Sequence, residues 1–293
     1  MTLELFLRRM TNPIRRAALT AALSLTAVSA LMGAPAEAGD FVVRDATRYA
    51  ENPNLAPYGL KDIIVAYESS LWPAGASKAT PDLNHIRNVY IPKIKSKNPD
   101  VLVLDIEVYK FTGAMSVTDW NNNINKLKSV IAVFKQEMPN TKIGYYLLMP
   151  ERNWLAACGD PRKRAARTAS WHDRNLRLQP LADAVDIIFP SLYTFYDDLA
   201  SQTCWQSYAK ANIAEAKMYG KPVWPFLWMK YHSNGKWISG PFWKVQLETV
   251  FNNADGVVIW SAATATDPWS WTAPWWVETK NFMTVKSLLP VTN

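Results

Sequence analysis

The chain of 293 residues is poor in the residues that bind metals or cradle phosphates. Its three histidines, His85, His172 and His232, have spacings that match no metal-binding template, so we expect no zinc or haem site and no cofactor. No glycine-rich phosphate loop follows the first clear apolar strand. This absence argues against a dinucleotide-binding domain.

Long runs of positive charge are also missing. The densest is Arg162-Lys163-Arg164, which indicates a solvated loop or the start of a helix. We therefore expect no nucleic-acid partner. The formal net charge of +7 still makes the chain mildly basic. Such a surface suits an anionic polymer, although solubility explains the charge equally well.

The N-terminal segment has the composition of an export signal. Arginines precede an apolar stretch over residues 17–32, and Ala36-Glu37-Ala38 offers a cleavage site. This pattern predicts a signal peptide over residues 1–38 and one mature domain over 39–293; the alternative is an uncleaved anchor. We expect a periplasmic or secreted protein, monomeric and not inserted in the membrane after cleavage.

The two cysteines are Cys158 and Cys204. Both fall in loops after predicted strands, and an even count in an exported chain favours one disulfide. Two free thiols are the alternative.

Apolar runs typical of buried strands alternate with amphipathic helices. The strands are predicted at 62–68, 101–107, 141–149, 185–193, 222–229 and 256–261, and the helices at 118–138, 161–181, 204–218, 242–251 and 275–289. Residues 83–95 are expected to hold only a short helix or turn, because Pro92 opposes a long one. This alternation predicts an α/β fold, a (β/α) TIM-like barrel of seven or eight parallel strands in a single domain. An open doubly wound sheet is the second choice.

The strand that begins at Val101 runs into two carboxylates, Asp105 and Glu107. Residues two apart project from the same face of a strand, and the carboxyl ends of parallel strands are where ligands bind. Two close carboxylates raise each other's pKa, so one can keep its proton near neutral pH and act as a general acid. A solvated strand terminus is the alternative.

Aromatic and hydroxyl side chains follow the later strands. They are Tyr145, Tyr146, Ser191, Tyr193, Trp228, Tyr231 and Trp260. Aromatic faces stack on the C–H face of a sugar, and phenols hydrogen-bond its hydroxyls. Any one of these rings could equally be a core residue, but together they predict a sugar-binding site.

This series of strand ends resembles the hyaluronidase family of glycoside hydrolases. The matching motifs are Asp105-Ile106-Glu107, Gly144-Tyr145-Tyr146 to Pro150-Glu151, Pro190-Ser191-Leu192-Tyr193, Pro225 to Tyr231, and Gly256-Val257-Val258-Ile259-Trp260. Their order and rough spacing agree over residues 60–265. The family's usual aromatic between the carboxylates is Ile106 here, and its usual cysteine after the tyrosine strand is absent.

The resemblance implies a hyaluronidase-like endo-β-N-acetylhexosaminidase that acts on a polysaccharide containing N-acetylhexosamine. Glu107 would protonate the leaving oxygen, and the 2-acetamido oxygen of the substrate would attack in place of a second carboxylate. The other roles implied are Asp105 holding the acetamido group, Tyr193 and Tyr231 hydrogen-bonding it, Trp260 walling the pocket, and Tyr146 touching the sugar near the cleaved bond.

Two other functions fit the same residues. A non-catalytic glycan-binding barrel would use the same aromatic rim. A hydrolase of a bacterial exopolysaccharide or cell-wall glycan would use the same carboxylates in a different mechanism.

Overall fold

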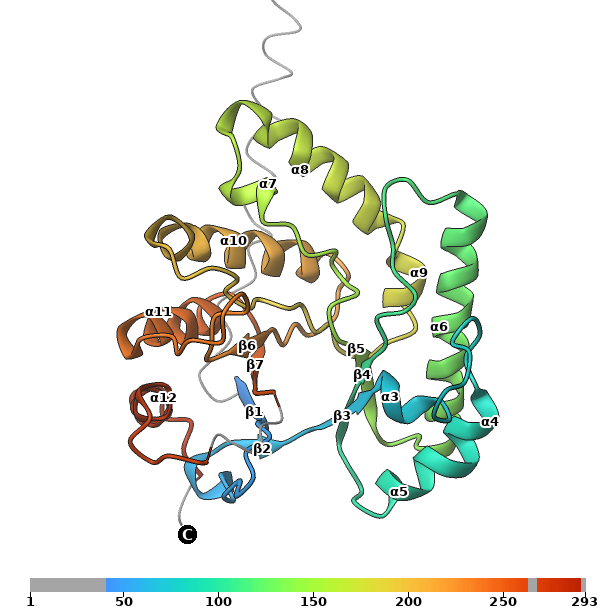
Figure 1. The fold of residues 1–293 in the computed structure, drawn as a ribbon, viewed down its shortest axis with the longest axis horizontal. Helices are drawn as coiled ribbons and strands as arrows, with labels where there is room; N and C mark the ends of the chain where they lie inside the picture. The colour runs from blue at the N-terminus through green and yellow to red at the C-terminus, as the bar shows by residue number, and fades with distance from the viewer. Residues whose placement is uncertain (1–40, 263–267, 291–293) are drawn as a thin grey trace, which may run out of the picture. The chain divides into compact units, whose positions relative to one another are not determined.

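A computed structural model describes residues 41–262 and 268–290 (Figure 1). The predicted signal peptide lies outside these residues. The strands are β1 (Val42–Ala46), β2 (Lys61–Asp62), β3 (Ile64–Tyr67), β4 (Val101–Asp105), β5 (Lys142–Tyr145), β6 (Phe226–Trp228) and β7 (Gly256–Trp260). Among the described residues, every pairing between these strands is parallel.

The strands form two sheets, with orders β2-β1-β7-β6 and β3-β4-β5. Strand β1 was not predicted, because Arg44 and Asp45 interrupt its apolar residues. Arg44 is buried all the same, and its guanidinium forms a bidentate pair with Asp100, at 2.9 and 2.6 Å. A partner 56 residues away compensates for the buried charge, and local sequence cannot reveal it.

The predicted strand 62–68 is divided between the two sheets. β2 pairs with β1, whereas β3 pairs with β4, and only Ile63 separates them. Glu68 is not part of the strand, because it begins helix α3 (Glu68–Leu71). One short run therefore contacts both sheets and delivers Glu68 to the end of β4.

The predicted strand 185–193 forms single bridges instead of a continuous ladder. The bridges are Tyr146–Phe189, Ile188–Val223 and Ser191–Phe226. Pro190 has no N–H to donate, although its carbonyl accepts from the Phe226 N–H at 2.8 Å. The segment still lies between β5 and β6 and connects the two sheets.

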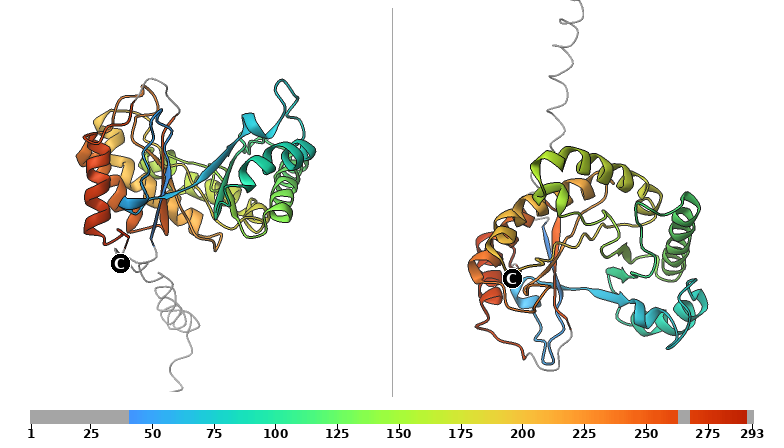
Figure 2. Two further views of the ribbon diagram at one scale, coloured as in Figure 1. Left: turned by 90° about the horizontal axis from the view of Figure 1, so that it is seen from below. Right: turned by 45° about the horizontal axis from the view of Figure 1, so that its top comes forward.

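Five long helices accompany the strands. They are α6 (Val117–Glu137), α8 (Pro161–Leu176), α10 (Leu199–Lys217), α11 (Gly240–Phe251) and α12 (Pro274–Val285). The prediction for 161–181 needs correction, because α8 ends at Leu176 and Pro180 lies in the first turn of α9 (Gln179–Ala182). Figure 2 shows α11 and α12 beside β1 and β7, and α6 on the side of β4 and β5.

Residues 83–95 are helical over a longer stretch than predicted. Helix α4 (Leu83–His85) continues through a π-helical segment (Ile86–Tyr90) into α5 (Ile91–Lys95). Pro92 stands at the start of α5, where a missing N–H costs least. One further short helix, α7 (Leu155–Cys158), precedes α8.

Apolar side chains pack on both faces of the strands. Val101 and Val103 of β4 belong to one buried cluster, and Leu102 and Leu104 belong to the other, which includes residues of α6. Because side chains alternate along a strand, Asp105 shares the face of Val101 and Val103. In the part of the chain that is described, no helix is long and apolar enough to cross a membrane.

Candidate active site

The carboxyl ends of the strands surround a cavity of about 220 Å³. We call it the catalytic cavity because it contains the two carboxylates that are predicted to act in catalysis. Its lining residues are Val65, Asp105, Glu107, Tyr146, Tyr193, Phe226, Trp228, His232 and Trp260. The structure therefore brings both predicted carboxylates together with four of the predicted aromatic residues.

Asp105 is the acidic group most affected by this cavity. Burial, the charge of Glu107 and the charge of Glu68 raise the pKa of Asp105 to about 7. The sequence predicted a raised pKa for one of the paired carboxylates, and Asp105, which ends a buried strand, has it. Glu107 lies two residues beyond this strand and is exposed. Its role as the acid, which the resemblance implies, stays a prediction.

Glu68 holds the backbone that carries Glu107. Its Oε2 accepts from the N–H groups of Glu107 and Val108, at 3.0 and 2.9 Å, and its Oε1 accepts from Lys78. Burial acts to raise the pKa of Glu68, but the hydrogen bonds from Lys78, Val108 and Glu107 outweigh it and lower the pKa. Sequence reasoning missed this role. The available clue was an acidic residue at the end of an apolar run, as at Asp105.

Aromatic rings form the walls of the catalytic cavity. Tyr193 stacks on Trp260, with ring centroids 5.4 Å apart and planes at 22°. Trp228 presents its ring nearly perpendicular to Trp260, at 5.3 Å. The indole N–H of Trp260 donates to the Tyr67 hydroxyl at 2.8 Å, which fixes the orientation of the ring. These rings can bind the apolar face of a sugar.

Tyr146 reaches the cavity with its phenol already engaged. Its hydroxyl donates to Ser191 Oγ at 3.0 Å and accepts from Tyr193. Burial raises the pKa of Tyr146 to about 12, so the phenol stays protonated at neutral pH. Ser191 is buried and does not line the cavity. It therefore orients Tyr146 from behind.

Two other predicted tyrosines lie outside the cavity. Tyr145 is 0 % exposed, and its hydroxyl donates to the Leu127 carbonyl of α6 at 2.9 Å. Adjacent residues of a strand point to opposite faces, so Tyr145 packs in the core while Tyr146 faces the cavity. Tyr231 is also buried and is not among the lining residues. Neither position is that of the predicted substrate contact.

His232 lines the cavity and was not predicted as a site residue. Its ring stacks on Phe195, with centroids 4.4 Å apart. Burial lowers the pKa of His232, and the charge of Arg152 lowers it further, against the opposing effect of Glu107. His232 is therefore neutral at pH 7 and can both donate and accept hydrogen bonds. Its position directly after Tyr231, at a strand end, was the clue.

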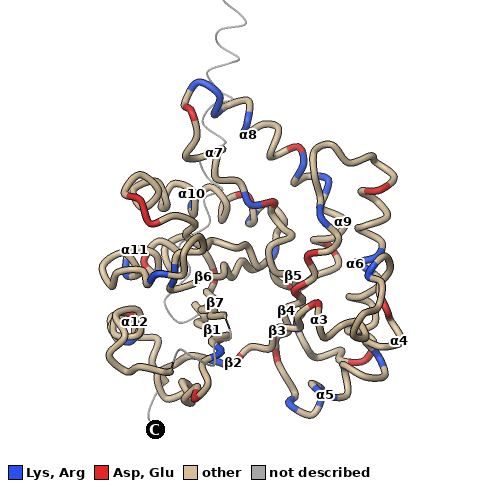
Figure 3. The backbone as a smooth tube through the Cα atoms, in the orientation of Figure 1, with Lys and Arg blue, Asp and Glu red and all other residues tan. Residues whose placement is uncertain are grey.

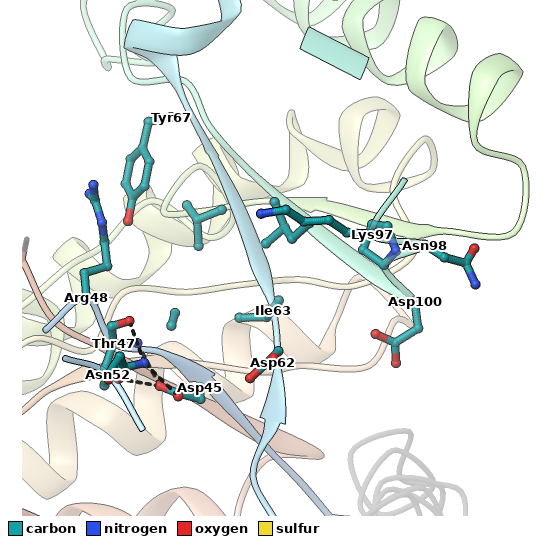
Figure 4. A pocket seen from close by; sticks show the side chains of 14 residues that line it. Asp45, Thr47, Arg48, Asn52, Asp62, Ile63, Tyr67, Lys97, Asn98 and Asp100 are labelled. Atoms are coloured by element: carbon teal, nitrogen blue, oxygen red, sulfur yellow. Dashed lines mark hydrogen bonds between the residues drawn. The ribbon is translucent and has the colours of Figure 1, made fainter. Parts of the chain in front are cut away.

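A second cavity, of about 600 Å³, lies beside β1 and β3 (Figure 4). Asp45 accepts there from the N–H and the hydroxyl of Thr47, at 2.8 and 2.6 Å, and burial nevertheless raises the pKa of Asp45. The Arg48 guanidinium lies over the Tyr67 ring, 4.7 Å from its centroid. Val65 lines both cavities, so they adjoin at β3.

Cys158 and Cys204 form a disulfide with an S–S distance of 2.03 Å. It connects α7 to α10 across 46 residues of sequence. Within residues 41–262 and 268–290, no group of three or more His, Cys, Asp or Glu side chains is arranged to hold a metal ion.

No protein-family model and no curated protein matches this chain. Among solved structures, bee venom hyaluronidase matches with a TM-score of 0.60 and 16% identity, over 85% of this chain and 99% of that chain. This fold is similar to that of bee venom hyaluronidase. The same bee enzyme in complex with a hyaluronic acid tetramer matches with a TM-score of 0.60 and 15% identity, over 85% and 98% of the two chains. An endo-β-1,4-mannanase from Thermotoga petrophila matches with a TM-score of 0.48 and 12% identity, over 88% and 79%. At these identities the likeness to the bee enzyme concerns the parallel α/β fold.

Proposed function

We propose that the protein is an exported, monomeric glycoside hydrolase that cleaves polysaccharides containing N-acetylhexosamine, as a hyaluronidase-like enzyme. One observation carries the proposal: Asp105 and Glu107 share a cavity with Tyr146, Tyr193 and Trp260 at the carboxyl ends of the strands. The fold similarity to bee venom hyaluronidase supports it, since the solved complex of that enzyme holds a hyaluronic acid tetramer.

In this proposal the two sheets close into one (β/α) barrel. The run 61–67 counts as one strand, and the segment 185–193 fills the position between β5 and β6. Two features support closure: the run pairs with both β1 and β4, and single bridges join the segment to its neighbours on either side. The barrel would then have seven strand positions, each delivering side chains to the same rim.

Glu107 would be the general acid. In the first step its proton moves to the glycosidic oxygen as the bond from that oxygen to C1 breaks, and the 2-acetamido oxygen forms a bond to C1. In the second step water attacks C1, its proton passes to Glu107, and the acetamido group is released. Both steps invert at C1, so the product retains the configuration of the substrate. The exposed position of Glu107 at the mouth of the cavity suits access to water.

Asp105 would act on the acetamido group. The bond from the acetamido oxygen to C1 leaves positive charge on the ring that forms, and an ionised Asp105 beside it would stabilise that charge. The pKa of about 7 poises this carboxyl between its two forms at neutral pH. Tyr146 and Tyr193 would hydrogen-bond the same sugar, and Trp228 and Trp260 would stack on it.

The substitution Glu107→Gln tests the acid. We expect a loss of hydrolysis of ~10²–10⁴-fold or more, with sugar binding and thermal stability retained, because the amide keeps the shape but cannot give a proton. Release of oligosaccharides from hyaluronan, chondroitin, chitin oligomers and bacterial exopolysaccharides would be followed by mass analysis.

Glu278→Gln on α12 is the matched control and should leave the rate unchanged. Full turnover by Glu107→Gln would refute the assignment of the acid. Binding of a glycan by the wild-type protein without any product would favour the non-catalytic glycan-binding function instead.

A further inference from the structure

A third cavity, of about 650 Å³, lies between the segment that follows β5 and helix α8. We call it the basic groove. Its charged lining residues are Arg152, Arg162, Lys163, Arg167, Arg174 and Glu151. Figure 3 shows how basic residues concentrate along α8. Five cations against one anion make this cavity strongly positive.

Two of the five cations are neutralised by neighbours. Arg174 pairs with Glu151 at 2.6 Å, and the exposed Arg162 pairs with Asp160 at 3.0 Å. The cations of the groove that form no ion pair among the described residues are Arg152, Lys163 and Arg167. The groove therefore keeps a net positive charge after its internal pairs are counted.

The floor of the groove is held in a fixed position. The Glu151 N–H donates to Asn175 Oδ1 at 2.9 Å, and the Glu151 carbonyl accepts from the Trp171 indole. Asn153 and Asn212 exchange two hydrogen bonds of 3.3 Å. Arg152 lies between Glu151 and Asn153 in the sequence, and these hydrogen bonds anchor both neighbours. The disulfide connects α7, which follows Asn153, to α10. The backbone that carries Arg152 is therefore set before any ligand arrives, which lowers the entropic cost of binding.

Arg152 connects the basic groove to the catalytic cavity. Its guanidinium lies over the Phe195 ring, 5.2 Å from the centroid. Phe195 also stacks on His232, which lines the catalytic cavity. A glycan chain that extends out of the catalytic cavity past His232 would meet Arg152 first, and then the cations of α8.

We propose that the basic groove is a binding site for oxyanions carried by the glycan: carboxylate, sulfate-ester or phosphate groups. The planar forks of Arg152 and Arg167 match the oxygen pairs of such groups, and Lys163 adds a point charge. That these groups belong to the polymer cleaved in the catalytic cavity rests on the proposed function. The anion site itself does not.

Two charge-reversal variants test the site. Lys163→Glu/Arg167→Glu changes the groove, and Lys128→Glu/Lys217→Glu makes the same change in net charge at exposed positions of α6 and α10. The probes are labelled chondroitin sulfate oligosaccharides, neutral chitin oligosaccharides, inorganic sulfate and inorganic phosphate. Binding is measured by fluorescence anisotropy for the sugars and by calorimetry for the free anions, over a range of salt concentrations.

We expect the groove variant to bind the sulfated oligosaccharide roughly tenfold more weakly or worse, with a shallower salt dependence, and to bind chitin oligosaccharides as the wild type does. The control should stay within about twofold of the wild type. Since Arg167 is half-buried, Lys163→Glu alone serves as a second variant at an exposed position, with a smaller loss expected.

Equal weakening in groove and control variants would overturn the proposal, as would failure of the wild type to bind any anionic probe. Binding of inorganic sulfate or phosphate, lost in the groove variant but without binding of the sulfated sugar, would confirm an oxyanion site and overturn its assignment to the glycan. The assays need no turnover. Anion binding without hydrolysis would therefore count against the proposed function and not against the groove.

Discussion

Asp105 illustrates how the position of a single residue sets its acidity. It shares a face of β4 with Val101 and Val103, so its carboxyl is drawn into the same buried layer. Two other carboxylates, Glu107 and Glu68, lie close enough to oppose its ionisation. Ionisation of a carboxyl in this position destabilises the fold at neutral pH, but the same position makes the carboxyl available for chemistry. Such a trade-off between stability and activity is common at active sites.

Because the ionised Asp105 carboxyl destabilises the fold, we expect Asp105→Asn to increase stability by an amount that depends on pH. The carboxyl has an ordinary pKa of 3.8 in the unfolded chain and about 7 in the folded one. Between these pH values the folded state binds more protons, so the free energy of unfolding falls as pH rises through this range. The neutral amide escapes this loss. We expect the variant to be more stable than the wild type by about 2–4 kcal/mol at pH 8, allowing for partial exposure, and little different near pH 4.

Denaturant unfolding at both pH values measures this difference. A stability difference that does not change with pH would contradict the raised pKa. The same variant should have lost most of its hydrolytic rate.

Glu68 offers a second test at the residue scale, because its charge and its shape can be separated. Glu68→Gln keeps an oxygen for the Glu107 and Val108 N–H groups but removes the charge that raises the pKa of Asp105. We expect the acidic limb of the pH–rate profile to move to lower pH. Glu68→Ala removes both, and should also lower kcat by ~10–100-fold through misplacement of Glu107. A Glu68→Gln profile with its acidic limb at the same pH as that of the wild type would show that Glu68 has no electrostatic effect on the reaction.

At the scale of elements, the accuracy of sequence reasoning depended on where each partner lies. Helix α6 was predicted within a residue or so at each end, because its apolar positions recur at helical spacing and Ser116 caps it locally. Strand β1 was missed, because the burial of Arg44 depends on its ion pair with Asp100, which lies 56 residues away. The segment 185–193 looks like a strand in its apolar pattern, but Pro190 interrupts the ladder. Patterns that depend on a few neighbouring residues were predicted, whereas the burial of Arg44 and the bridges of the segment 185–193 depend on distant partners and were not.

The same distinction explains which site residues the sequence could identify and which only the structure reveals. Alternation along β5 places Tyr145 and Tyr146 on opposite faces, and the sequence listed both because it could not tell which face meets the cavity. Asp105 and Glu107 were found because they lie two residues apart, at the end of one apolar strand and just beyond it. Glu68 and His232 come from other strand ends, and only the three-dimensional arrangement brings them to the same cavity.

The disulfide between α7 and α10 supports a prediction about these elements. Replacing both Cys158 and Cys204 by serine removes a constraint that spans 46 residues of the chain. A loop of this length corresponds to a loss of about 2–4 kcal/mol in the free energy of unfolding. Thermal unfolding with and without a reducing agent checks it. The reductant should destabilise the wild type and leave the double variant unaffected, and equal stability of the two proteins would contradict a structural role.

At the scale of the whole described domain, the contact between β5 and the segment 185–193 holds the two sheets together. Gly144 of β5 makes this contact possible. A Cβ at Gly144 would lie 2.1 Å from the Ile187 carbonyl and 2.7 Å from the Phe189 ring. The backbone φ of Gly144 is one that other residues can adopt. Glycine is therefore needed here only because a side chain would not fit between the two segments.

Gly144→Ala should therefore destabilise the protein as a whole, by about 1–3 kcal/mol or more, because backbone must move to make room. Gly113→Ala is the control, since its nearest neighbour would be the Arg174 side chain at 3.6 Å, an ordinary contact. Guanidinium unfolding of both variants measures the effect. If Gly144→Ala left the free energy of unfolding unchanged, the two sheets would not be closely packed at this point.

The run 61–67 has a consequence for how the chain tolerates change in length. β2 and β3 belong to different sheets, and only Ile63 separates them. One residue inserted at that point would leave the β2 pairing in place and turn the side chains of β3 to the opposite face. Val65 would turn away from the catalytic cavity, and Tyr67 would no longer meet the indole of Trp260. The number of residues from Asp62 to Tyr67 therefore cannot change by an odd number without disrupting the proposed sugar site. The loop from Arg48 to Leu60 carries no such constraint.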